Sequence, residues 1–190
     1  KYAWILLYLM KFLTFSDVHA DIGLLKKLVK RAQQKDIDFV ICAGDFTVFE
    51  NYMASVLKEM DKMGKPLFTI PGNNETTGRL VKEFKKYKNL VPIHNTLVRE
   101  GGVTILGWGT DGFARHSDEF RHVARELRKL LNANDKKVIL VTHAPPYKTK
   151  LDEMGGEHVG NADVRIGIER IKPRMAISGH IHENEGKRDK

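Results

Sequence analysis

The stretch DFVICAGD, residues 38–45, contains an unbroken apolar run that ends in a glycine and an aspartate. A short apolar run bounded by turn-forming residues is typical of a buried β-strand, so we expect a strand at residues 39–43. Gly44 lets the backbone turn sharply after this strand. The sequence therefore places the Asp45 carboxylate at the carboxyl end of a buried strand.

The same arrangement recurs along the chain. Apolar runs alternate with amphipathic segments, which is the pattern of a layered α/β fold. We expect strands at residues 11–15, 39–43, 66–70, 103–108, 137–142 and 174–178, and helices at residues 21–34, 51–63 and 117–132. The polar segment 144–161 is too long for a simple connection, and we expect it to be a functional loop.

The composition predicts one compact domain. The chain has 190 residues, of which 42% are hydrophobic, enough to bury a sizeable core. Its formal charge of +8 attracts phosphate-bearing partners, but it does not choose between a nucleotide, a nucleic acid and an anionic membrane. The lone cysteine, Cys42, excludes an intrachain disulfide, is expected to be buried and structural, and favours a cytoplasmic location.

The apolar segment at residues 1–9 is too short to span a bilayer, which takes about 20 apolar residues, and no signal-peptide cleavage site follows it. We expect an extension that precedes a domain of residues 10–190, with apolar packing or self-association as the alternative. No membrane partner is expected.

Residues that can bind a metal ion follow nearly every expected strand. These residues are Asp17, His19, Asp45, Asn73, His143, His180 and His182. Because the carboxyl ends of strands in an α/β sheet lie at one rim, we expect the side chains to converge there. Seven ligands are too many for one tetrahedral zinc site and suit two metal ions that share a bridging carboxylate.

Two pairs of these residues are spaced by two positions. If the local chain is extended, Asp17 and His19 point the same way, and so do His180 and His182. Each pair can then hold a metal ion between its side chains. Glycines 44, 72 and 179 are expected to let the chain turn just before a ligand.

The ordered blocks DVH, GD, GNNE, THAPP and GHIH resemble the calcineurin-like metallophosphoesterase superfamily, whose pattern is DxH, GD, GNH(D/E), H and GHxH. The resemblance extends from about Met10 to His182. It implies a four-layer α-β-β-α sandwich with a dinuclear metal site at the carboxyl rim of the strands. It also implies the ligand sets: Asp17, His19 and His182 for the first metal, Asn73, His143 and His180 for the second, and Asp45 as the bridge.

The resemblance further implies a metal-dependent phosphoesterase that uses a metal-bridging hydroxide. The substrates expected are phosphodiesters or activated phosphomonoesters of small molecules, including nucleotides. The ligand types accept manganese, iron, zinc or nickel and do not choose among them. Two alternatives stay open, which are a weakly catalytic metal-binding scaffold of the same fold and a nuclease.

Asn74 departs from the family pattern, which has a histidine at this position. That histidine is taken to contact the phosphate and to protonate the leaving oxygen. Asparagine can donate a hydrogen bond but cannot supply a proton near neutral pH. Asn74 is therefore interpreted as a tolerated variant in an active enzyme, as the mark of a substrate with a good leaving group, or as the mark of drift toward a scaffold.

Other residues receive weaker interpretations. His158, in segment 144–161, is the candidate for an alternative proton donor or phosphate contact, while His94 and His122 are expected to be structural or solvated. The basic runs have helical spacing and lack interleaved aromatic residues, so nucleic acid is not the favoured partner. The family usually continues into further strands, so we expect either a longer protein or a sheet edge that a partner, such as a second copy of the chain, covers.

Overall fold

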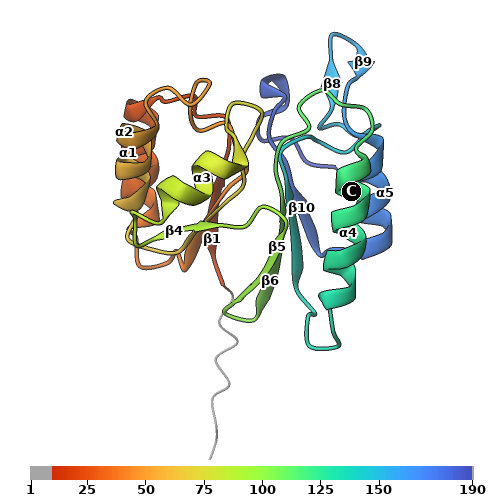
Figure 1. Cartoon of the computed structure of the whole chain (residues 1–190), viewed down its shortest axis with the longest axis horizontal. Coiled ribbons are helices and arrows are strands. Elements are labelled where there is room, and N and C mark those ends of the chain that lie inside the picture. Colours follow the sequence, from red (N-terminus) through yellow and green to blue (C-terminus); the bar gives the residue numbers. More distant parts are fainter. Residues whose placement is uncertain (1–9, 190) are drawn as a thin grey trace, which may run out of the picture.

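Two four-stranded sheets face each other between two layers of helices in the computed structural model, which describes residues 10–189 (Figure 1). The first sheet has the order β1-β2-β3-β4 and is parallel throughout; its strands are β1 (Phe12–Phe15), β2 (Phe39–Cys42), β3 (Leu67–Thr69) and β4 (Leu90–Pro92). The second sheet has the order β10-β7-β6-β5, and only the pairing of β5 with β6 is antiparallel; its strands are β5 (Thr96–Glu100), β6 (Val103–Trp108), β7 (Val138–Thr142) and β10 (Met175–Ile177). The predicted four-layer sandwich is confirmed.

The helices cover the outer faces of the two sheets. On the first sheet lie α1 (Ile22–Ala32), α2 (Met53–Asp61) and α3 (Thr77–Phe84), which share one apolar core with it. On the second lie α4 (Asp118–Leu130) and α5 (Ala162–Ile171). A small hairpin, β8 (Glu153–Met154) and β9 (Glu157–His158), and a 3-10 helix, η1 (His182–Asn184), complete the described elements.

Strand β2 shows how the sequence builds the layers. Its side chains alternate between the two faces of the sheet, as the period of two requires. Phe39 and Ile41 pack between the two sheets, and Val40 and Cys42 pack under the helices. Cys42 is buried and unpaired, as predicted, and every position of the strand is apolar because both faces are covered.

The predicted strands form within one residue at either end, and the predicted helices within two. Two of the three predicted helices begin with a side-chain cap, since Asp21 accepts a hydrogen bond from Leu24 N in α1 and Ser117 accepts one from Phe120 N in α4. The structure adds α3, α5, β4, β5 and the β8-β9 hairpin, which were not predicted. The extension predicted at residues 1–9 lies outside the described residues. Within residues 10–189, no helix is long and apolar enough to cross a membrane.

The carboxyl ends of the two sheets meet at one rim. Asp17 N donates to Gly44 O (3.0 Å), which joins the ends of β1 and β2, and Gly179 N donates to His143 O (3.1 Å), which joins the ends of β10 and β7. His143 Nδ1 lies 2.8 Å from Ala43 O and so links the second sheet to the first. The rim on which the sequence places its polar residues is therefore continuous across both sheets.

Candidate metal centre

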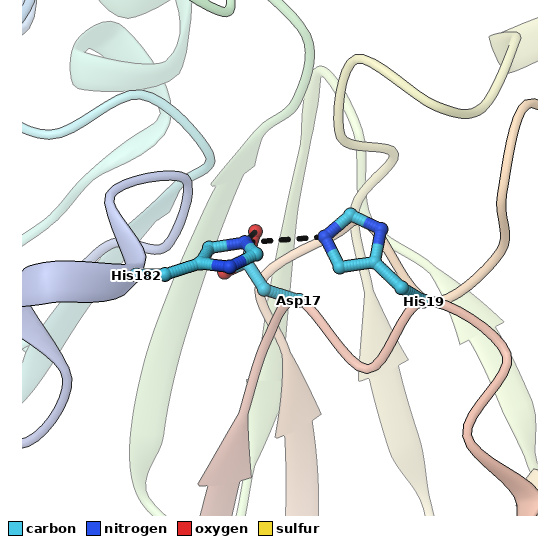
Figure 2. A group of neighbouring side chains, drawn as sticks. All are labelled: Asp17, His19 and His182. Carbon is cyan, nitrogen blue, oxygen red and sulfur yellow. Dashed lines mark hydrogen bonds and ion pairs between the residues drawn. The ribbon is translucent and has the colours of Figure 1, made fainter.

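Three of the predicted ligands form a first cluster: Asp17, His19 and His182. Each offers one ligand atom, and these atoms lie within 4.8 Å of one another. His19 Nε2 lies 3.2 Å from His182 Nε2, which in turn lies 3.6 Å from Asp17 Oδ1. Figure 2 shows the two imidazole rings facing each other beside the Asp17 carboxylate. The first cluster thus joins the loop after β1 to the start of η1.

Asp45, His143 and His180 form a second cluster, again with ligand atoms within 4.8 Å of one another. They follow β2, β7 and β10. His143 Nε2 lies 3.5 Å from Asp45 Oδ2 and 3.1 Å from Asn73 Oδ1, so the Asn73 amide oxygen lies beside this cluster. All the predicted ligand positions are therefore brought together at the rim.

The two clusters are in direct contact. His180 N donates to Asp17 Oδ2 at 2.9 Å, so a carboxylate of the first cluster is held by the backbone of the second. Asp17 and His19 share a cluster, as their spacing predicted, and His180 and His182 are divided between the two, as the ligand sets implied by the family resemblance divide them. The prediction that the second pair acts together is wrong, because the left-handed backbone at His180, with φ of 75°, separates the directions of its side chain and that of His182.

Hydrogen-bond acceptors converge in the second cluster. His143 Nδ1 faces the Ala43 carbonyl oxygen, which can only accept, so Nδ1 carries the proton and Nε2 of the neutral ring presents a lone pair. That lone pair faces the oxygens of Asn73 and Asp45, which are also acceptors. A proton on His143 or a bound cation would supply the positive charge that compensates this convergence of acceptors.

Unsatisfied polar atoms also fit bound cations. Within residues 10–189, three buried side-chain polar atoms have no hydrogen-bond partner, and two of them, Asp17 Oδ1 and His180 Nε2, belong to the clusters. A buried polar atom without a partner costs about 1–3 kcal/mol. A divalent cation held by nitrogen and oxygen ligands would satisfy one such atom in each cluster.

The electrostatics of the second cluster favour a charged carboxylate and one neutral imidazole. Burial raises the pKa of Asp45, but hydrogen bonds from the protonated form of His143 and from Asn74 outweigh it, and the pKa lies below its ordinary value. Burial and the neighbouring His143 lower the pKa of His180 to about 4. An ionised carboxylate and a neutral imidazole are the forms that bind metal ions.

Four of the predicted ligands have a backbone conformation that ordinary residues avoid. They are Asp17, His19, Asp45 and His180, with φ values of 55°, 45°, 50° and 75°. The left-handed region costs a non-glycine residue roughly 1–2 kcal/mol. The extended chain that the spacing of two assumed is therefore wrong at the ligands themselves. Strain of this kind persists where the surrounding structure imposes it and is characteristic of functional sites.

Glu75 fixes the loops that carry these ligands. Its side chain is buried, and Oε1 accepts hydrogen bonds from Thr47 N (2.8 Å) and Thr47 Oγ1 (2.7 Å). Oε2 accepts from Gly72 N (2.8 Å) and Asp45 N (3.0 Å). The carboxylate thus joins the turn after β2 to the turn after β3. Its position in the GNNE block could have identified it, but the sequence does not show which groups it would bind.

Glu75→Gln is expected to lower the free energy of unfolding of the metal-free protein by about 1–3 kcal/mol. The reason is that an amide NH₂ replaces an oxygen that accepts hydrogen bonds from two buried donors. Denaturant unfolding measures the change. The control is Glu83→Gln. Glu83 lies on α3 and its carboxylate pairs with Lys86 at the surface, so this variant should change stability by less than about 0.5 kcal/mol. Equal losses in the two variants would contradict the role assigned to Glu75.

Asn74, where the family pattern has histidine, is buried beside the second cluster. Its backbone N donates to Asp45 Oδ1 (2.8 Å) and its Nδ2 donates to Asp45 Oδ2 (2.6 Å). Its Oδ1 accepts a hydrogen bond from Phe49 N (3.0 Å). Asn74 therefore holds both oxygens of the Asp45 carboxylate, while a direct contact between its amide and a phosphate stays a prediction.

His158 lies in strand β9 and in neither cluster. Its Nδ1 lies 2.8 Å from Asp152 Oδ1, and this buried carboxylate also accepts hydrogen bonds from the backbone of Thr149 (2.8 Å) and Gly160 (2.9 Å). The pair resembles a positioned acid-base group, because Asp152 orients the ring and fixes the tautomer with the proton on Nδ1. Its use in catalysis stays a prediction.

The remaining histidines of the sequence lie outside the clusters. His94 accepts a hydrogen bond from Gly109 N at 3.0 Å and packs against Trp108, and burial lowers its pKa, so it is structural as predicted. His122 is exposed on α4, also as predicted. His116 is exposed and lies 3.4 Å from Asp163 Oδ2.

The chain matches one protein family and several known proteins over most of its length. The profile of a family described as calcineurin-like phosphoesterase matches residues 10–184. An uncharacterized protein of Methanocaldococcus jannaschii is 27% identical over 186 residues, which cover 92% of this chain and 81% of that protein. A probable glycerophosphodiester phosphodiesterase of Arcobacter nitrofigilis is 30% identical over 164 residues, which cover 76% of this chain and 56% of that protein.

Solved structures share the fold at low sequence identity. The crystal structure of a dimetal phosphatase from Danio rerio superimposes with a TM-score of 0.62 at 12% identity, and the match covers 92% of this chain and 82% of that one. At this identity the likeness concerns the fold alone. The chain spans little more than half of the Arcobacter phosphodiesterase, 56% of its length.

Proposed function

The chain belongs to the calcineurin-like phosphoesterase family, and from this premise we propose that it is a hydrolase of phosphodiesters or activated phosphomonoesters that depends on two divalent metal ions. The observation that carries the proposal is the convergence of acceptors at the rim. Asp17 Oδ1 and His180 Nε2 are buried without hydrogen bonds, and His143 Nε2 faces two further acceptors. Cations in both clusters would satisfy these atoms.

We assign the ligands from this arrangement. One ion would be held by the first cluster, and the other by His143, His180 and Asn73, with Asp45 as the bridging carboxylate. When bound, two divalent cations supply the positive charge that lowers the pKa of water and neutralises a phosphate ester. Manganese, iron, zinc and nickel all accept these ligand types.

The residues around the ligands have separate tasks in this proposal. Asn73 offers a neutral oxygen, which adds no negative charge where an anionic ester must bind. Asn74 orients the Asp45 carboxylate through two hydrogen bonds. His158, oriented by Asp152, is the candidate for the group that protonates the leaving oxygen. General acid catalysis typically contributes 10²–10⁴-fold, so this role has a measurable consequence.

The substrate class proposed is a phosphate ester of a small molecule or a nucleotide. The net charge of +8 favours an anionic substrate without selecting one. The buried unpaired cysteine supports a cytoplasmic location. We further propose that residues 10–190 act as one catalytic domain.

The decisive experiment is turnover of aryl phosphodiester and monoester substrates by metal-stripped protein supplied with manganese, nickel or zinc. We expect activity that appears only after metal is added. Metal binding by calorimetry without turnover of any ester would support the alternative of a weakly catalytic scaffold. Neither binding nor turnover would overturn both the ligand assignment and the enzyme.

Asn74→His is expected to raise the turnover of alkyl phosphodiesters by about 10-fold or more, because it restores a group that can donate a proton near neutral pH. Aryl esters, whose leaving groups need no proton, should change much less. The measurement is kcat for a methyl and a nitrophenyl ester of the same phosphate. Asn74→Gln keeps an amide without a titratable proton and should not produce this difference. Equal effects on both esters would show that position 74 does not act in proton transfer.

A further inference from the structure

The loop between β6 and α4, residues 109–117, carries a phenylalanine that touches the second cluster. Thr110 N donates to the Pro71 carbonyl oxygen at 3.0 Å, which holds the loop against the PGNNE turn. The Phe113 and His180 rings have centroids 4.2 Å apart and an interplanar angle of 61°, a T-shaped contact. Phe113 therefore lies directly beside a proposed metal ligand.

The Phe113 ring is exposed, although exposure of a large apolar side chain is unfavourable. The residue retains 59% of its accessible surface. His180 packs against one part of the ring, and the residue is otherwise largely exposed to solvent. A phenylalanine that served only to pack the loop would be expected to be buried.

The backbone before Phe113 is held in an unfavourable conformation. Thr110, Asp111 and Gly112 have φ values of 76°, 71° and 46°, and the first two are not glycines. Asp111 is fixed on both sides, because its carboxylate accepts a hydrogen bond from Trp108 Nε1 and its carbonyl oxygen accepts one from Ala114 N. The surrounding structure therefore imposes this conformation, which brings the ring against His180.

We propose that Phe113 forms an aromatic wall of the substrate pocket and contacts a planar aromatic group, an aryl ring or a nucleobase, that the phosphate ester carries. This inference rests on the proposed function and specifies the substrate class of the same site. A phosphate held at the second cluster would place its ester group within reach of the ring that packs on His180. Aromatic rings associate in offset-stacked and T-shaped arrangements, for which the free surface of Phe113 is available.

The test compares the binding of phenylphosphonate and methylphosphonate, which are not hydrolysed, to the metal-loaded protein by calorimetry. The wild type should bind phenylphosphonate more tightly. Phe113→Ala should weaken phenylphosphonate binding about 10-fold and methylphosphonate binding less than about 2-fold. Phe113→Tyr, which keeps the ring, should retain the preference, whereas Phe113→Leu, which keeps the apolar volume, should lose most of it.

Two controls separate substrate contact from structural effects. Leu130 is as exposed as Phe113, at 58%, but it is the last residue of α4 and belongs to neither cluster. Leu130→Ala should therefore change neither binding constant. Metal affinity, titrated in the Phe113→Ala variant, should equal that of the wild type. A parallel loss of metal affinity and of both phosphonates would make Phe113 a support for His180 and would overturn the inference.

The outcomes also separate this inference from the proposed function. If the wild type shows no preference for phenylphosphonate, or if Phe113→Leu binds it as well as the wild type does, the aromatic contact is wrong even when esters are hydrolysed. If the preference depends on the ring but no ester is hydrolysed with any metal, the proposed function fails while the aromatic contact stands.

Discussion

Asp45→Ala is expected to reduce metal-dependent ester hydrolysis by roughly 1,000-fold or more, because the metal centre contributes several kcal/mol to such reactions and this carboxylate is proposed to hold both ions. The metal-free protein should also become less stable, by about 1–3 kcal/mol for each of the two Asn74 donors that lose their acceptor. The stabilisation by metal should disappear. For a site filled at 100 times its Kd, that stabilisation is about 2.7 kcal/mol.

The matched control for this variant is Asp135→Ala. The Asp135 side chain is as buried as that of Asp45, with 3% of its surface exposed, but it lies outside both clusters, paired with Arg99 at 2.8 Å. Its loss should destabilise the protein while leaving activity per folded molecule and the metal-induced rise in Tm intact. A metal-induced rise in Tm that persisted unchanged in Asp45→Ala would show that this carboxylate is not a ligand.

Gly72→Ala is expected to destabilise the protein by about 3 kcal/mol and to lower turnover roughly 100-fold. A Cβ built on Gly72 would lie 2.0 Å from Asp45 Oδ1 and 2.5 Å from Asp45 N, distances at which one group must move. Either the Asp45 carboxylate shifts, which misplaces a proposed ligand, or the turn shifts, which breaks the hydrogen bond from Gly72 N to Glu75. Thermal unfolding and steady-state kinetics measure the two effects.

Gly78→Ala provides the comparison for this variant. Gly78 lies in α3, and a Cβ built there meets no atom within 4 Å. Alanine in a helix interior is favoured over glycine by roughly 0.5–1 kcal/mol, so this variant should be more stable than the wild type and equally active. If Gly72→Ala behaved like Gly78→Ala, the close approach of Gly72 to Asp45 would not be a constraint on the site.

The layers of the fold and the convergence of ligands were predictable from the sequence. Buried strands such as β2 are apolar at every position, so their limits are visible in the chain, and the residue that follows each strand must lie at the rim. The metal-binding type of Asp45, Asn73 and His143 is equally visible. The parallel arrangement of the strands brings these residues together at one rim. The alternation of apolar runs and amphipathic segments already indicated that arrangement.

Other elements could not be predicted because tertiary contacts determine them. Helix α5 contains Gly167, which weakens the helical pattern, yet a Cβ there would lie 2.8 Å from the Phe120 ring, so close packing requires glycine. The family resemblance implied the division of His180 and His182 between two ligand sets, but the left-handed backbone at His180 that accompanies it was not predictable from the spacing of the two histidines. The roles of Glu75 and Phe113 depend on which atoms they contact, and an exposed phenylalanine in a glycine-containing loop gives no signal in the sequence.

The distribution of the ligands along the chain has a consequence for the order of folding. His19 and His182 face each other although they are 163 residues apart, and His143 meets Ala43 across 100 residues. Contacts of such long range form only after most of the chain has been organised, because the entropy of closing the intervening loops must be offset first. The centre therefore cannot nucleate the fold, in contrast to small zinc domains that need their metal to fold. An ion can therefore bind at this rim only in molecules whose two sheets have already docked.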